Sequence, residues 1–252
     1  MKVKNLRLKR GIYILPSLFT TGNVFCGFYA IIAAMSEQYE LAAWAIVAAM
    51  VFDVLDGRVA RLTKTTSAFG VQYDSLADII SFGVAPAIVV YTWILKPFGR
   101  LGWMAAFLFL LCAALRLARF NVTKPDVSGQ NFIGLPTPAA AAATASVVIA
   151  FEDLFHTRID PIFMVVMMYS LAFLMVSNIK YPAMKKFVFK KRVTFSRFLF
   201  VILFLYVFAT IPRITVFLIT VAYIFIGPIG PLLRKPPEAA SETGEPAPNG
   251  SK

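Results

Sequence analysis

Eight stretches of this chain are long and apolar enough, or nearly so, to cross a lipid bilayer. A hydrocarbon core about 30 Å thick needs about 20 mostly apolar residues per helix, and a helix pairs its own backbone groups where lipid offers no partner. The sequence therefore predicts an all-α, polytopic integral membrane protein. We place the spans near residues 14–35, 40–62, 75–95, 101–122, 136–155, 161–179, 194–211 and 213–232.

The count of about eight depends on the last two stretches. Only Ile211, Pro212 and Arg213 separate them, so they form either a tight hairpin or one kinked element. Seven or six spans are the alternatives.

Composition excludes other broad classes of protein. Of the 252 residues, 59% are hydrophobic and 15% are charged, whereas a soluble domain carries about 45–50% apolar and about 25% charged residues. Neither an ordinary soluble enzyme nor a disordered protein fits. The net charge of +12 lies between apolar runs, where anionic lipid headgroups rather than nucleic acid are the expected counter-charge. Two cysteines, Cys26 and Cys112, provide neither a disulfide framework nor a cysteine zinc site.

Positive charge sets the expected orientation, because Lys and Arg in short loops stay on the cytoplasmic side. With the N-terminus inside, all but four of the 25 lysines and arginines face the cytoplasm. We therefore expect the protein to lie in the cell membrane, with both termini on the cytoplasmic side. Residues 1–13 form a basic interfacial segment or a solvated flank, residues 14–232 the transmembrane domain, and residues 233–252 a disordered cytoplasmic tail.

Four aspartates lie at the cytoplasmic ends of the second and third spans: Asp53, Asp56, Asp74 and Asp78. An ionised carboxylate inside a membrane helix costs at least about 2.5–3.5 kcal/mol and is functional by default. Spacings of three and four residues put each pair on one helix face, and consecutive antiparallel helices can bring both pairs to one point. Oxygen ligands without His or Cys suit Mg²⁺, Mn²⁺ or Ca²⁺, and four such charges require about two divalent ions.

Small and basic residues surround these acids. Gly57 and Ala60 lie on the face of the first pair, and Gly70 precedes the second pair. They either leave room for an extended ligand against the backbone or permit close helix packing. Arg58 and Arg61 can bind phosphate oxygens, although each also fits the positive-inside rule. Together these features indicate phosphoryl or pyrophosphate transfer; the alternative class is a cation transporter, whose path is also lined by intramembrane acids.

The spacing of these residues also resembles a known signature. Residues 53–61 read D-V-L-D-G-R-V-A-R and residues 70–78 read G-V-Q-Y-D-S-L-A-D, with eight residues between them. This resembles, without a departure, the D-x-x-D-G-x-x-A-R and G-x-x-x-D-x-x-x-D signature of the CDP-alcohol phosphatidyltransferases. The resemblance implies a membrane enzyme with a six-helix core, usually a homodimer. Such an enzyme splits a CDP-linked lipid or alcohol, releases CMP and joins the phosphatidyl group to a hydroxyl.

The resemblance also implies roles for individual residues. Asp53, Asp56 and Asp74 would be ligands of Mg²⁺ or Mn²⁺, and Asp78 would lie near the second metal and act as general base. A further set would bind CDP-diacylglycerol: Thr20, Asn23, Gly57, Ala60, Arg61, Ser67 and Gly70.

Outside the signature, the chain is similar to the membrane-embedded phosphatidylserine synthases in residues 16–27, 116–121 and 132–140. This similarity implies L-serine as the acceptor of the phosphatidyl group. It does not identify the lipid tails, because apolar grooves do not encode chain chemistry.

Two arginines and an asparagine are the expected serine site. Arg116 and Arg119 lie three residues apart on one helix face. They form either a clamp for a carboxylate or phosphate or a pair of snorkelling positive-inside residues, and we add Asn121 to the site. Glycerol 3-phosphate and inositol phosphate stay open as acceptors, because arginines also bind their phosphate groups.

The expected orientation can be tested by labelling. In a background without Cys26 and Cys112, the Lys64→Cys and Glu152→Cys variants should react differently with an impermeant maleimide added outside the cell, because the two positions lie on opposite sides of the membrane. Only Glu152→Cys should be labelled. Equal labelling of both variants would contradict the orientation.

Overall fold

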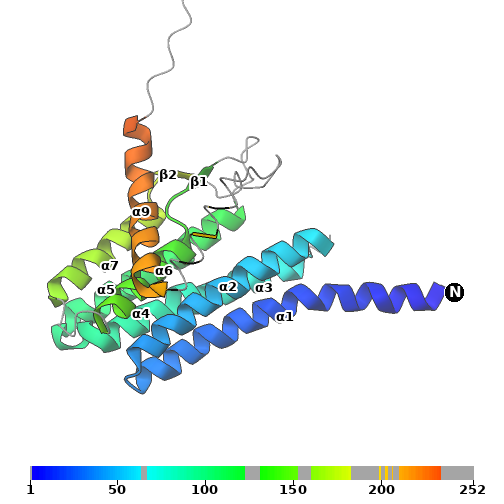
Figure 1. Ribbon diagram of the computed structural model, residues 1–252, viewed down its shortest axis with the longest axis horizontal. Coiled ribbons are helices and arrows are strands. Elements are labelled where there is room, and N and C mark those ends of the chain that lie inside the picture. Colours follow the sequence, from blue (N-terminus) through cyan, green and yellow to red (C-terminus); the bar gives the residue numbers. More distant parts are fainter. Residues whose placement is uncertain are drawn as a thin grey trace, which may run out of the picture.

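The computed structural model describes residues 2–63, 67–122, 131–152, 160–182, 199, 202–203, 206 and 210–233 (Figure 1). Its main helices are α1 (Lys2–Met35), α2 (Tyr39–Thr63), α3 (Ala68–Asp78), α4 (Ala85–Val90), α5 (Arg100–Val122), α6 (Thr137–Ala150), α7 (Pro161–Val176) and α9 (Pro212–Leu233). Two short strands, β1 (Asn131–Ile133) and β2 (Lys180–Pro182), pair antiparallel. The prediction of an all-α membrane protein is confirmed, with this small strand pair as an addition.

The third expected span is a continuous helix, Ala68–Phe98, whose pitch changes along its length. After α3 come the π-helical segment η1 (Ile79–Val84), then α4, the π-helical segment η2 (Tyr91–Leu95) and the 3-10 turn η3 (Lys96–Phe98). Short π-helical segments inside α-helices are frequent at functional sites. Here the first of them begins directly after Asp78.

Within the described part of the chain, three helical stretches are long and apolar enough to cross a membrane: Pro16–Met35, Ala68–Phe98 and Arg100–Val122. α2 is also long enough, but Asp53 and Asp56 interrupt its apolar run. α6, α7 and the first part of α9 are shorter apolar helices.

The N-terminal basic segment and the eighth expected span both lie within described helices. α1 runs unbroken from Lys2, so the basic segment expected at residues 1–13 is the first part of the same helix as the first span. The eighth expected span corresponds to α9. The seventh, residues 194–211, lies largely outside the described residues, as does the tail at residues 233–252.

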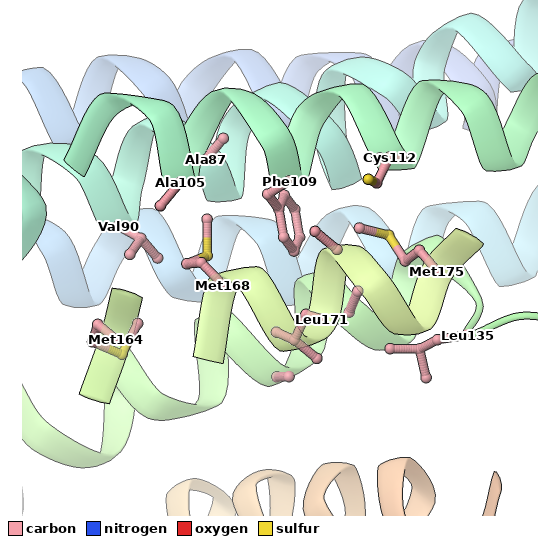
Figure 2. Packing of buried hydrophobic residues seen from close by; sticks show 14 of the residues in the cluster. Ala87, Val90, Ala105, Phe109, Cys112, Leu135, Met164, Met168, Leu171 and Met175 are labelled. Carbon is pink, nitrogen blue, oxygen red and sulfur yellow. The ribbon is translucent and has the colours of Figure 1, made fainter. Parts of the chain in front are cut away.

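Two groups of buried apolar side chains hold the bundle together. The larger joins α4, η2, α5, α6 and α7; Figure 2 shows Phe109 of α5 pointing toward α7, with Met168 and Met175 nearby. The smaller lies between α1, α2, α4 and α6 and is rich in alanine, which lets helix backbones approach closely. α1 packs along α2 and also contacts α3 (Figure 1).

α1 contacts the third span through a glycine. A Cβ atom on Gly27 would lie 2.3 Å from the Ser81 Oγ and 2.7 Å from the Ser81 Cα, so no larger residue fits without a shift of backbone. The Ser81 hydroxyl donates a hydrogen bond to the Asn23 carbonyl oxygen at 2.9 Å. Small residues and hydroxyl groups at such contacts are how membrane helices associate. This contact fixes α1 against η1, directly after Asp78.

The contact predicts the effect of a larger residue. Gly27→Leu should lower the free energy of unfolding by about 1–3 kcal/mol, because it inserts atoms where none fit. The measurement is the unfolding midpoint of purified protein in detergent, with Phe25→Leu as the control, since Phe25 is 66% exposed on the same helix. An unchanged midpoint for Gly27→Leu would contradict the close contact.

Candidate active site

Three of the four aspartates meet at one point. Asp53 and Asp56 of α2 and Asp74 of α3 offer oxygens that all lie within 4.8 Å of one another. Asp56 is buried, and the buried Oδ1 of Asp74 has no hydrogen-bond partner among the described residues. Carboxylates this close repel one another in a medium of low dielectric unless a cation neutralises them. A group of oxygen donors with one atom unpaired fits a hard divalent cation such as Mg²⁺ or Mn²⁺.

Asp78 lies one turn further along α3 and is not a member of this group of three. Sequence spacing alone suggested that all four carboxylates converge, but the structure brings three together and sets the fourth beside them. The Asp78 Oδ1 accepts a hydrogen bond from the Asn23 Nδ2 at 3.5 Å. Asp78 also interacts electrostatically with Arg116 of α5. It therefore connects the carboxylate group with the far side of the site.

α1 supplies two buried polar side chains to the acids. The Thr20 hydroxyl donates to the Asp56 Oδ2 at 2.9 Å, and Asn23 contacts Asp78 as described above. Thr20 is 4% exposed and Asn23 is fully buried. The Asn23 Oδ1 has no partner among the described residues, which leaves one acceptor for a ligand inside the bundle.

A cavity of about 210 Å³ opens beside the carboxylates, between α1, α2 and α3. It is lined by six of the seven residues expected at CDP-diacylglycerol and by two of the aspartates: Thr20, Gly57, Ala60, Arg61, Ser67, Gly70, Asp56 and Asp74. Asn23, the seventh, is fully buried and does not line the cavity. Residues separated by up to 58 positions in the sequence, Pro16 and Asp74, thus line one space.

The glycines of the cavity are not packing residues. A Cβ atom on Gly57 would meet only the Arg61 guanidinium, at 3.8 Å, and one on Gly70 would meet only the Ser67 Oγ, at 3.1 Å, among the described residues. Close helix packing, the alternative explanation for small residues here, therefore applies to Gly27 but not to Gly57 or Gly70. The open space beside their backbones is available to a ligand.

Ser67 has a structural function as well. Its Oγ accepts a hydrogen bond from the Gly70 N–H at 2.9 Å and so caps the N-terminus of α3. Such a cap satisfies one of the unpaired N–H groups of the first turn. The hydroxyl hydrogen can still be donated to a ligand in the cavity.

Arg116 is a buried cation. It is 7% exposed, and its Nη1 donates to the Thr137 Oγ1 at 2.8 Å. Its Nε has no partner among the described residues, and its guanidinium carbon lies 5.9 Å from the centre of the Phe120 ring. A buried guanidinium with an unpaired N–H is expected to bind an anion, and this favours the clamp over snorkelling at this position.

Arg119 and Asn121 have other partners. The Arg119 guanidinium donates to the backbone oxygens of Ile133, Val176 and Ser177, so the structure does not show the two arginines facing one ligand. Asn121 forms a hydrogen bond with Ser75 of α3, at 3.0 Å from its Nδ2 to the Ser75 Oγ. Of the three residues expected at serine, Arg116 is the one that is buried and has an N–H without a partner among the described residues.

Sequence reasoning missed Thr137. Its side chain is fully buried at the first turn of α6, and it orients Arg116. The signals were its place between Pro136 and Pro138, which predicts a helix start, and its place in the stretch 132–140 that is similar to phosphatidylserine synthases; neither predicts what the hydroxyl contacts.

The fold and the site define the class: a polytopic membrane protein with an acidic site, fit for a cation, at one end of its helices. Within that class, the chain belongs to the CDP-alcohol phosphatidyltransferases, because the family model of that description matches residues 13–176. The matched part contains all four aspartates and the helices from α2 to α7. The chain is therefore an enzyme of a phosphotransferase family.

Several relatives carry a more specific name. A CDP-diacylglycerol–serine O-phosphatidyltransferase of Helicobacter pylori is 43% identical over 178 residues, which are 69% of this chain and 74% of the relative. The Bacillus subtilis protein of the same name is 33% identical over 172 residues, 68% of this chain and 92% of the relative. An archaetidylserine synthase of Methanothermobacter thermautotrophicus is 36% identical over 170 residues, 67% and 69% of the two chains.

The hydrogen bond from α1 to the acids predicts a loss of activity. Thr20→Val keeps the shape of the side chain but removes the donor to Asp56, and a hydrogen bond to a charged group contributes about 1.5–3 kcal/mol. CMP release by the purified protein should therefore fall by about tenfold or more. Thr21→Val is the matched control, because the Thr21 hydroxyl lies 3.0 Å from the Tyr73 hydroxyl and not at the aspartates. Equal losses in both variants would contradict this role.

Proposed function

We propose that this enzyme transfers the phosphatidyl group of CDP-diacylglycerol to the hydroxyl of L-serine, giving phosphatidylserine and CMP. One observation carries the proposal: the buried Arg116 guanidinium interacts electrostatically with the Asp78 carboxylate. The first can hold an amino acid's carboxylate, and the second can take a hydroxyl proton. The names of the bacterial relatives support serine as the acceptor.

The donor binds in the cavity between α1, α2 and α3. Gly57 and Gly70 leave the backbone accessible to an extended ligand, and Arg61 offers a planar guanidinium to the phosphates. Two divalent cations, Mg²⁺ or Mn²⁺, would be held by Asp53, Asp56 and Asp74, with Asp78 near the second cation. Bound there, they would neutralise charge on the pyrophosphate.

The acceptor binds on the other side of Asp78, next to α5 and α6. Thr137 orients the Arg116 guanidinium through its hydrogen bond. The Arg116 Nε–H has no partner among the described residues and can donate a hydrogen bond to a ligand. A carboxylate pairs with two parallel N–H groups of a guanidinium. We therefore assign the carboxylate of serine to Arg116 and leave Arg119 and Asn121 outside direct contact with it.

Asp78 is the proposed general base. It accepts the proton of the serine hydroxyl as that oxygen attacks the phosphorus next to the lipid, because a neutral hydroxyl is a poor nucleophile. The new O–P bond forms as the bond from this phosphorus to the bridging oxygen breaks, and CMP leaves with the electron pair. Asn23 holds Asp78 in place through its hydrogen bond. The transfer takes one step and needs no nucleophile from the protein.

We place this chemistry on the cytoplasmic side of the cell membrane. The acidic site lies at the same ends of α2, α3 and α5 as Arg58, Arg61, Arg116 and Arg119, and positive charge stays inside. A homodimer of this chain is part of the proposal, on the strength of the family resemblance.

The test is a comparison of acceptors. Purified protein receives CDP-diacylglycerol, Mg²⁺ or Mn²⁺, and one acceptor at a time: L-serine, glycerol 3-phosphate or inositol phosphate. Only serine should release CMP above the background without acceptor, and excess chelator should stop the release. Faster release with either phosphate-bearing acceptor would overturn serine as the substrate.

Asp78→Asn tests the general base. Turnover should fall at least about 10²-fold, the usual contribution of such a base, whereas binding of CDP-diacylglycerol should change little. CMP release and donor binding are measured on the same preparation. Asp160→Asn is the matched control, because Asp160 caps α7 far from the site and Asn caps a helix equally well.

A second measurement addresses the single step. Labelled CMP is mixed with enzyme and CDP-diacylglycerol in the absence of any acceptor. Direct attack predicts no incorporation of label into CDP-diacylglycerol, since only a phosphatidyl-enzyme would return the group to CMP. Rapid exchange would refute the one-step transfer.

A further inference from the structure

We infer that Arg119 is a positioning residue for the acceptor side of the site: it fastens the segment between β1 and α6 to α5 and so fixes Thr137, the partner of Arg116. The inference rests on the proposed function, because it assumes that Arg116 binds the acceptor.

The Arg119 guanidinium reaches two separate parts of the chain. Its Nη1 donates to the Val176 carbonyl oxygen at 3.0 Å and to the Asn178 Oδ1 at 3.4 Å. Its Nη2 donates to the Ile133 carbonyl oxygen at 3.1 Å and to the Ser177 carbonyl oxygen at 3.3 Å. Val176 ends α7, and carbonyls at a helix end lack partners within the helix. One side chain of α5 thus supplies donors to the end of α7 and to β1.

The segment after β1 is fixed residue by residue. The Gly134 N–H donates to the Ile179 carbonyl oxygen at 2.8 Å, and the Leu135 N–H donates to the Leu174 carbonyl oxygen at 3.0 Å. Leu135 is fully buried. Gly134 has a φ of +80°, and a Cβ atom there would lie 2.3 Å from the Met175 carbonyl oxygen. Only three residues separate Ile133, which Arg119 holds, from Thr137.

Thr137 connects this fixed segment to Arg116. Its Oγ1 accepts the hydrogen bond from Arg116 at 2.8 Å, so a shift of the segment moves the group that orients Arg116. Arg116 and Arg119 lie on the same face of α5, one turn apart, yet one is left with a donor available and the other binds backbone oxygens. A guanidinium with N–H groups in a fixed fork suits four oxygens in different directions, and a lysine ammonium does not.

A double-mutant cycle separates positioning from direct contact. In the full-length enzyme, Arg119→Lys keeps the charge but loses the fork, and the KM for serine should rise about tenfold with kcat and the KM for CDP-diacylglycerol little changed. Thr137→Val removes the acceptor of Arg116 and should raise the same KM, whereas Thr137→Ser should restore it. Because both variants act through Arg116, the double variant should be no worse than the worse single one.

Two results would overturn the inference: an unchanged KM for serine in Arg119→Lys, or effects that multiply in the double variant, as direct contact of Arg119 with serine requires. If Arg119→Lys does not yield monodisperse protein, Asn178→Ala removes one of the four contacts and enters the same cycle, with a smaller rise expected. If the wild type releases CMP with another acceptor instead of serine, the proposed function fails. The double-mutant cycle is then measured with that acceptor, and its result tests the positioning role of Arg119 independently of the identity of the acceptor.

Discussion

Repulsion between carboxylates inside a membrane protein is the constraint on which the rest of the structure depends. Asp53, Asp56 and Asp74 offer oxygens within 4.8 Å of one another, and in a medium of low dielectric such a group is stable only with cations and hydrogen-bond donors close by. The surrounding elements meet this need. α1 donates from Thr20, and the cavity beside Gly57 leaves space for the charged ligand that completes the site.

The placement of α1 follows from small residues rather than from apolar burial alone. Lipid tails are as apolar as the helices, so close packing and hydrogen bonds decide which helices associate. Gly27 and Ser81 provide both at one point, and Asn23, one turn before Gly27, is thereby brought to Asp78. The π-helical segment that begins at Ile79 lies at this contact, where the pitch of the third span departs from that of a regular α-helix.

The site has two halves that differ in construction. In the proposed function, the half that would bind the donor is made by α1, α2 and α3, mostly from a run of 26 residues, whereas the half that would bind the acceptor draws on α5, α6, α7 and the strand pair. Asp78 interacts with residues of both. A reaction that joins two substrates at one phosphorus requires such an arrangement, because both must be held in place while the hydroxyl of one attacks the phosphorus of the other.

The sequence by itself determined the helical class, most of the spans and the identity of the acids, since apolar length and the cost of buried charge are local properties. It also identified most of the residues that line the cavity, through a resemblance to a family signature. Tertiary structure decided the rest. Asp78 lies outside the group of three acids but interacts with them electrostatically, Arg119 binds backbone oxygens, and the Thr137 hydroxyl accepts a hydrogen bond from Arg116. The hydrogen bonds of Arg116 to Thr137 and of Arg119 to backbone oxygens join residues 14 to 58 positions apart, and helical spacing predicts which side chains share a face, not which partners lie opposite.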